Sequence, residues 1–417
     1  MVTRIPVVVV GAGHAGLGVS RVLTEHGVDH VVLERGEVAN TWKTERWDSL
    51  RLLTPNSLTR LPGGFAYDGD DPDGFMPIPE LIGWIERYAA KVDVPVQTRT
   101  TVTSVTAKAG GGYTVATERD GEPGGWEAQA VVLASGGFNV ARIPEVGAGI
   151  PASIAQVTAH GYKRPDQLGP GRVLVVGASA TGLQLADELL RSGREVTVAV
   201  GEHVRMPRRY RGRDAFHWLG ELGRLDERFD EVDDLVRARH VPSPQLVGTS
   251  DAAGLDLNTL SNRGATLVGR LAGLRDGTAL FSGSLRNVCA LADLKQARLL
   301  DGVDEWVAAH EGDRSAAERP EPTRIDGDPR TSIDMVAEGY DTVLWATGFR
   351  ADYSWLQVPV LDRKGEIRHD GGVVTTAPGL YRIGTNFLRR RKSSFIFGLE
   401  DDAVDLVDHL VTVTSGV

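Results

Sequence analysis

The sequence contains one cysteine, Cys289, among its 417 residues. A single thiol excludes a disulfide framework, a four-cysteine zinc site and any CxxC redox pair within the chain, and no metal site is expected. The chain also lacks an excess of positive charge. Its 46 Lys and Arg residues are outnumbered by 56 Asp and Glu residues, which gives a formal net charge of −10. This balance provides no overall positive field for nucleic acid or an anionic membrane, so neither is expected as a partner.

Long hydrophobic runs are missing as well. No apolar run reaches the roughly 18 residues that cross a bilayer. The first residues, Met1–Pro6, lead directly into a β-run and leave no room for the apolar core of a signal peptide. The composition, 41% hydrophobic and 24% charged, is typical of a soluble globular protein. We therefore expect a cytoplasmic protein, which at about 150 residues per domain would have two or three domains.

A strand–glycine turn–helix–strand pattern occurs twice in the chain. Its first copy consists of a buried strand, a turn, a helix and a second strand, at 5–10, 11–16, 17–26 and 28–34. The second copy has the same parts at 172–176, 177–182, 183–192 and 195–200. The two turns begin 177 − 11 = 166 residues apart. This repetition predicts two nucleotide-binding modules.

The first turn reads Gly11-Ala-Gly13-His14-Ala15-Gly16. Glycines at this spacing allow a tight turn, a close approach to a pyrophosphate and packing of the helix on the strand. The helix that follows presents free N–H groups to the phosphates. Glu34, at the end of the second strand, has a carboxylate that suits a ribose diol and would repel a 2′-phosphate. The first module is therefore predicted to bind FAD or NAD.

The second turn, Gly177-Ala-Ser179-Ala-Thr181-Gly182, has a serine in place of the middle glycine. No acid ends its second strand in the way that Glu34 ends the first. A basic loop follows, with Arg205, Arg208 and Arg209. Guanidinium groups bind phosphate monoesters through paired hydrogen bonds, so we predict NADPH here. A solvated basic loop, or a site for NADH built on Glu202, is the alternative.

Several further segments resemble one family. The run from Glu37 to Pro62 contains Trp42 and ends in a Leu-x-Leu-Leu-Thr-Pro-Asn56-Ser core, and Glu34 is followed by Arg35. Val102 enters a predicted meander, and two turns read Ala134-Ser-Gly136 and Ala346-Thr347-Gly348. As a set these segments are similar to those of flavin-containing monooxygenases, including the plant YUCCA type.

The resemblance implies an α/β fold with two Rossmann-like domains. The FAD domain would be discontinuous, at 1–150 and 336–417, and the NADPH domain with a helical insertion would occupy 151–335. The implied FAD contacts outside the first turn and Glu34 are made by Arg35, Trp42, Val102, Ala134, Gly136, Thr347 and Gly348. Asn56 would be the catalytic residue facing the flavin.

In that family NADPH reduces FAD, reduced FAD adds O₂ to give a C4a-hydroperoxide, and one oxygen atom passes to a small organic substrate. An oxidase or reductase without oxygen transfer, a Baeyer–Villiger enzyme and a protein that holds FAD without turnover are the alternatives. Thr158 stands where the family fingerprint has histidine, and His160 is displaced from it by two residues. This departure weakens the Baeyer–Villiger assignment. The substrate is not specified, and a homodimer remains open.

Overall fold

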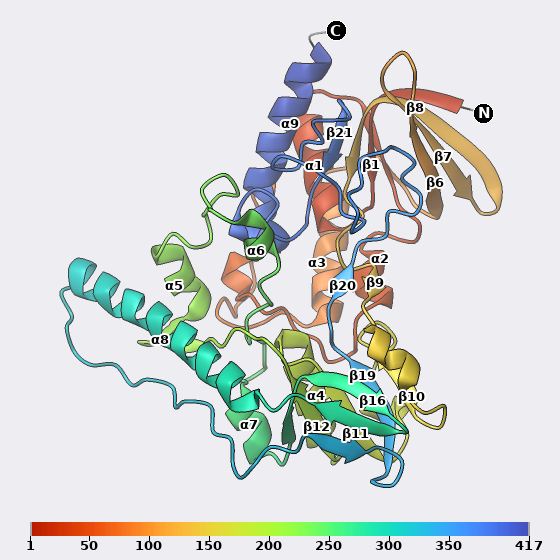
Figure 1. The fold of residues 1–417 in the computed structure, drawn as a ribbon. Coiled ribbons are helices and arrows are strands. Elements are labelled where there is room, and N and C mark those ends of the chain that lie inside the picture. Colours follow the sequence, from red (N-terminus) through yellow and green to blue (C-terminus); the bar gives the residue numbers. More distant parts are fainter. Residues whose placement is uncertain (1, 416–417) are drawn as a thin grey trace.

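The computed structural model describes residues 2–415. Two mainly parallel sheets lie at opposite ends of the molecule, each flanked by helices, with the first in the upper half of Figure 1 and the second in the lower half. The predicted fold class, α/β with two Rossmann-like domains, is confirmed. Among residues 2–415, no helix combines the length and apolarity that a bilayer-spanning helix needs.

The first sheet has seven strands in the order β5-β2-β1-β8-β7-β6, with β21 also paired to β8. β1, β2, β5, β8 and β21 run parallel, whereas β6, β7 and the start of β8 form an antiparallel meander. The strands span Val2–Val10 (β1), His30–Leu33 (β2), Val96–Gln97 (β5), Thr100–Ala107 (β6), Tyr113–Arg119 (β7), Glu122–Leu133 (β8) and Leu380–Arg382 (β21). β8 therefore joins the meander and the parallel sheet in one strand.

Alternate side chains of the first sheet enter two different cores. Val7, Val9 and Val132 face the helices α1 (His14–Glu25), α3 (Ile78–Lys91) and α9 (Leu399–Ser415). Val8 and Val131 face the meander and the segment 351–377. Because both faces are covered at the centre of the sheet, the buried ends of β1 (Val7–Val10) and β8 (Ala130–Leu133) are wholly apolar, which is why the sequence predicted these strands.

The second sheet has five parallel strands in the order β10-β19-β11-β12-β15. They span Ala155–Thr158 (β10), Arg172–Val176 (β11), Val196–Val200 (β12), Thr266–Gly269 (β15) and Tyr340–Trp345 (β19), and α4 (Ala180–Arg191) follows β11. β19 thus belongs to the second sheet, although the sequence placed 336–417 with the first module. The chain returns to the first sheet only afterwards, with β21 and α9. The helical insertion is the chain between β12 and β19, and it also contains β15, which the sequence did not predict.

The insertion carries four helices and short hairpins. The helices are α5 (Ala215–Glu221), α6 (Leu235–Arg239), α7 (Leu257–Asn262) and α8 (Leu285–His310), and the paired strands are β13 (Arg209–Tyr210) with β14 (Arg213–Asp214) and β16 (Leu271–Arg275) with β17 (Thr278–Phe281) and β18 (Ser332–Asp334). Figure 1 shows α8 as a long helix along the outer edge of the second module.

Two crossing segments connect the modules. β9 (Val140–Ala141) leads into the second module, and β20 (Phe349–Arg350) leads out of it. They pair with each other in antiparallel fashion, and both lie between the two sheets in Figure 1. The remaining short elements are α2 (Asn40–Thr44), β3 (Arg60–Leu61), β4 (Phe65–Ala66) and the 3₁₀ turns Asn56–Leu58, Glu145–Gly149, Pro165–Gln167, Arg391–Ser394 and Ile396–Gly398.

The modules also touch where Gly248 lies against Leu52 and Phe75. A Cβ atom on Gly248 would collide with the carbonyl oxygen of Leu52 and lie 2.8 Å from Cβ of Phe75. Backbone of the second module therefore lies directly against the first module at this point. Only glycine fits there.

We expect Gly248→Ala to lower the free energy of unfolding by about 1–3 kcal/mol, because an added methyl group must push the modules apart. Gly254→Ala is the matched control, since its Cβ would meet nothing nearer than 3.9 Å. Urea unfolding of both variants measures the difference. Equal midpoints for the two would show that the contact between the modules is loose.

Candidate functional site

The first glycine turn connects β1 to α1. Gly11 has φ +108°, and a Cβ there would lie 2.7 Å from the carbonyl oxygen of Ala134. A Cβ on Gly16 would collide with the carbonyl of Gly11, whereas one on Gly13 would meet nothing within 4 Å. Gly13 is also the N-cap of α1, and no side chain caps the helix. The turn thus combines tight internal packing with open space and free N–H groups, the features that receive a pyrophosphate.

Glu34 is held at the end of β2 by two backbone donors. Its Oε2 accepts from the Ala12 amide at 2.9 Å, and its Oε1 accepts from the Gly36 amide at 2.9 Å. The residue is buried, so these bonds offset much of the cost of removing the charge from water. Each carboxylate oxygen keeps a further lone pair, which could accept from a ribose hydroxyl.

The side chains of His14, in the first glycine turn, and Trp42 lie close to each other. Their ring centroids are 6.4 Å apart, and the Arg46 guanidinium carbon lies 5.3 Å from the centre of the Trp42 ring. Burial lowers the pKa of His14 to about 4, so the ring is neutral at pH 7. Its Nε2 is buried without a hydrogen-bond partner among the described residues. Such an orphaned atom beside the phosphate-binding turn fits a site that FAD completes.

The other predicted FAD contacts occupy different surroundings. Ala15 and Val102 are buried, and exposed Arg35 forms an ion pair with Glu45. Gly136 and Gly348 have φ of +80° and +86° and lie in the two turns where the modules join. The Thr347 hydroxyl donates to the Arg142 carbonyl, and the Arg142 amide donates to the Gly348 carbonyl. This last pair of bonds ties the crossing segments together.

The second glycine turn repeats the construction of the first. Gly177 has φ +116°, and a Cβ there would collide with the Ala346 carbonyl, as Gly11 would with Ala134. Ser179 is the N-cap of α4 without a side-chain cap bond, and Thr181 and Gly182 lie in its first turn. Each Ala-x-Gly turn therefore supplies the carbonyl against which a glycine turn packs. The N–H groups of α4 remain available to a second dinucleotide.

The sequence missed Gln245, which lies in the insertion with no surrounding motif. Its Nε2 donates to the Ala178 carbonyl at 2.7 Å within the second turn. Its Oε1 is buried and has no partner among the described residues.

Two of the three predicted phosphate ligands are engaged elsewhere. Arg205 is only 4% exposed and donates to Asp293 at 2.8 Å and to Asp256 at 2.7 Å. Arg208 is 3% exposed and donates to the Asp214 carboxylate at 2.7 Å. Both charges are neutralised by carboxylates within the fold, which argues against the prediction that Arg205 and one of Arg208 or Arg209 bind a 2′-phosphate. Arg209 is exposed and has no ion pair among the described residues.

Arg208 instead connects the modules. Its guanidinium donates to the Leu53 carbonyl of the first module at 2.8 Å. Its Cζ lies 4.8 Å from the centre of the Phe75 ring and 5.7 Å from that of the Phe216 ring. Burial lowers the pKa of Arg208, and the Asp214 carboxylate opposes this shift.

Asn56 lies three residues beyond that contact. It is 3% exposed, and its Nδ2 donates to the Asp71 carbonyl at 2.9 Å. Its Oδ1 is buried without a partner among the described residues. The amide is thus fixed in orientation and keeps one N–H and one carbonyl oxygen for a further contact.

The segment that departs from the family fingerprint lies against the crossing between the modules. Tyr162 is buried and donates to Glu188 of α4 at 2.9 Å. His160 stacks on Phe349 with centroids 4.7 Å apart, and burial lowers its pKa. Thr158 ends β10, and its carbonyl accepts from the Tyr162 amide. His160 therefore packs against β20 at the crossing between the modules.

Residues 8–213 match the sequence model of the pyridine nucleotide-disulphide oxidoreductase family. Over these residues the chain is similar to this family. It is an oxidoreductase, and this similarity implies FAD and NAD(P)H as its cofactors. The free N–H groups and orphaned atoms at both turns fit that pair of cofactors.

Several relatives are similar over most of the chain. An uncharacterized CzcO-like oxidoreductase of Geobacillus kaustophilus is 29% identical over 98% of both chains. The indole-3-pyruvate monooxygenase YUCCA1 of Oryza sativa subsp. japonica is 26% identical over 84% of this chain and 78% of its own length. A flavin-containing monooxygenase from Stenotrophomonas maltophilia has the same fold, with a TM-score of 0.69, 19% identity and coverage of 98% and 99%. The resemblance to flavoprotein monooxygenases inferred from the sequence is confirmed.

We expect Arg208→Met to lower the free energy of unfolding by about 3–5 kcal/mol, since it leaves the Asp214 carboxylate without its cation and frees the Leu53 carbonyl. Arg209→Met is the control, and its effect should stay within about 0.5 kcal/mol because Arg209 is exposed. Urea unfolding checks both. An Arg208→Met protein that is stable but binds NADPH more weakly would show that Arg208 binds the coenzyme.

Acidification should destabilise the fold through His14. The folded pKa of about 4 lies below the ordinary value of 6.5, so between these values the unfolded state binds the proton more readily. The contribution of neutral His14 to the free energy of unfolding is fully present above pH 6.5. It falls by roughly 3 kcal/mol as the pH decreases toward 4. His14→Asn should reduce the difference between the urea midpoints at pH 7 and pH 5. The same difference in both proteins would contradict the assignment.

Proposed function

We propose that the protein is an FAD-dependent, NADPH-consuming monooxygenase that inserts one oxygen atom of O₂ into a small organic substrate. Bound FAD would accept hydride from the coenzyme and supply the oxygen chemistry. The chain's own residues bind both cofactors, orient them and exclude water. The proposal depends most on the buried segment around Asn56, which sits where the first module meets the second.

The position of Asn56 supports oxygen transfer. Oxygen transfer by bound FAD would need a site in which the protein excludes water and fixes its polar contacts in advance. Asn56 is nearly completely buried, its orientation is set by Asp71, and part of its amide has no partner within the protein. The Arg208 contact with Leu53 closes the neighbouring backbone against the second module.

Disulfide reduction, the chemistry in the family's name, requires a reactive thiol. Cys289 is 1% exposed in α8, among apolar residues of the second module's core. Burial raises the pKa of its thiol to about 11, so the thiolate is scarce at pH 7. The cysteine has the properties of a packing residue, which favours oxygen transfer over thiol exchange.

The proposal is tested by following NADPH oxidation with a panel of amines, sulfides, indole-like aromatics and ketones while hydrogen peroxide is measured. Product formed in proportion to NADPH with one class supports a monooxygenase. Complete recovery of the electrons as peroxide with every class would make the protein an oxidase. A ketone converted to an ester would restore the Baeyer–Villiger alternative.

Asn56→Ala should keep FAD and accept hydride from NADPH at a similar rate, but release more peroxide in place of product. One lost hydrogen bond in a dry site corresponds to roughly 1–3 kcal/mol, which is about five-fold or more in the ratio of peroxide to product. Asn262→Ala, at an exposed position at the end of α7, is the control. An Asn56→Ala protein that stays fully coupled would remove Asn56 from the oxygen chemistry.

A further inference from the structure

The end of the second sheet nearest the second glycine turn holds an arginine that the sequence did not single out. β12 and β15 run parallel with Val200 beside Gly269, so the next residues, Gly201 and Arg270, are neighbours. Cγ and Cδ of Arg270 lie 3.8 and 3.9 Å from the position that a Cβ on Gly201 would take. The stem of Arg270 therefore lies along the glycine that follows β12. In an open parallel sheet, ligands bind at this edge.

The corresponding place in the first module shows which part of a dinucleotide would arrive there. The Gly11 amide donates to the Leu33 carbonyl, and the Gly177 amide donates to the Ala199 carbonyl. This match places Val200 where the first module has Glu34. A carboxylate at this position binds the ribose diol and repels a 2′-phosphate. Val200 is apolar and completely buried, so this repulsion is absent from the second module.

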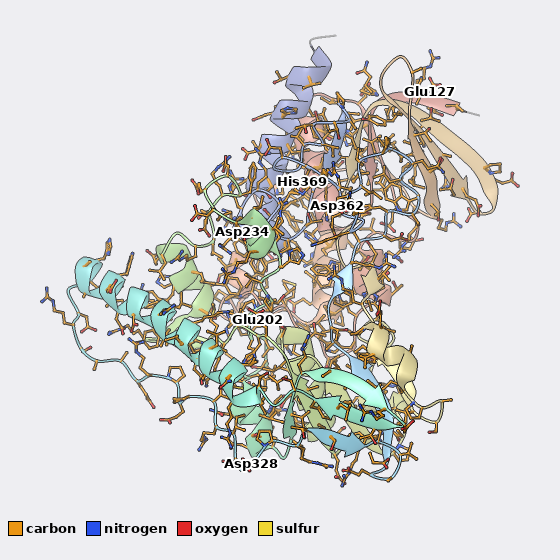
Figure 2. All side chains as sticks on the ribbon, viewed as in Figure 1. Glu127, Glu202, Asp234, Asp328, Asp362 and His369 are labelled. Carbon is orange, nitrogen blue, oxygen red and sulfur yellow. The ribbon has the colours of Figure 1, made fainter. Side chains whose placement is uncertain are left out.

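The charges around Gly201 single out Arg270. Arg205 and Arg208 are neutralised by buried ion pairs. The Arg270 side chain is exposed and has no hydrogen bond or ion pair in residues 2–415. Glu202, labelled in Figure 2 toward the middle of the molecule, is 68% exposed and lies 3.3 Å from Nζ of Lys295. One cation thus lies beside Gly201 and another beside Glu202. The Lys295 charge has a partner, whereas the Arg270 charge has none among residues 2–415.

The geometry points to Arg270, at the end of β15, as the residue that binds the 2′-phosphate of NADPH and sets the preference over NADH. Its planar guanidinium can donate two parallel hydrogen bonds to one phosphate monoester. Lys295 contributes a second cation by exchanging its contact from Glu202 to the phosphate. The basic loop after β12 then has a structural role, and the specificity of the coenzyme comes from the neighbouring strand. The inference rests on the proposed use of NADPH, but it does not require oxygen transfer.

The backbone at Gly201 is held ready for this role. His203 is 1% exposed, and its Nδ1 lies 3.0 Å from the Gly201 carbonyl oxygen. Burial lowers the pKa of His203, so the ring is neutral and can donate this hydrogen bond from Nδ1. The carbonyl is thereby turned toward His203.

Isothermal titration of the FAD-loaded protein with 2′,5′-ADP and with 5′-ADP tests the assignment without turnover. The wild type should bind 2′,5′-ADP at least tenfold more tightly than 5′-ADP. Arg270→Ala should lose at least tenfold in affinity for 2′,5′-ADP and change by less than twofold for 5′-ADP. Arg270→Lys, which keeps the charge but not the paired donors, should fall between wild type and alanine. Arg209→Ala, the matched exposed arginine, should leave both affinities within twofold.

Two results would overturn the inference. A wild type that binds 5′-ADP at least as tightly as 2′,5′-ADP would assign the position to Glu202 and a plain ribose. Loss of 2′,5′-ADP affinity in Arg209→Ala but not in Arg270→Ala would return the phosphate to the loop after β12. Neither result depends on whether the enzyme oxygenates a substrate, so failure here is distinct from failure of the proposed reaction.

Discussion

The relation between the two modules depends on one buried guanidinium. Arg208 belongs to the second module, yet it donates to the Leu53 carbonyl of the first and lies near aromatic rings from both. Its charge is balanced by Asp214, which also caps α5 by accepting from the Phe216 amide. The backbone just before Asn56 is therefore fixed by a residue about 150 positions further along the chain. Because a buried cation needs every one of its partners, this contact allows few alternative arrangements of the modules.

A second constraint, the close packing of a glycine turn against a carbonyl oxygen, occurs in both modules. In each module the first glycine of the turn packs against a carbonyl from an Ala-x-Gly turn that follows a neighbouring strand, at Ala134 and at Ala346. Since both of these turns begin a crossing segment, the phosphate-binding turns and the connection between modules share the same backbone. A shift of one module on the other would be felt directly at both turns. The position of each phosphate-binding turn is thus coupled to the backbone that connects the two modules.

The sequence was a sufficient guide where the signal is local. The βαβ units, Glu34 and the glycine turns follow from buried β-branched runs and the spacing of glycines, and the structure contains all of them. The role of the basic loop was not visible, because the partners of Arg205 and Arg208 are carboxylates at 214, 256 and 293 that no spacing rule connects to them. β15 was missed because four residues between glycines give little periodicity. Arg270, at its end, was missed with it.

The insertion of the second module within the chain of the first has a consequence for how the protein folds during synthesis. The first sheet acquires β21 and α9 only from the last part of the chain, whereas β10 to β19 lie entirely within the middle. During synthesis from the N-terminus, the second module can complete its sheet while the first still lacks the strand beside β8 and the helix that covers α1. Domains generally fold as units in the order in which they emerge. Here the inserted module finishes before the one that surrounds it, and the growing chain must keep the apolar faces of α1 and β8 from misassociating until its final residues appear.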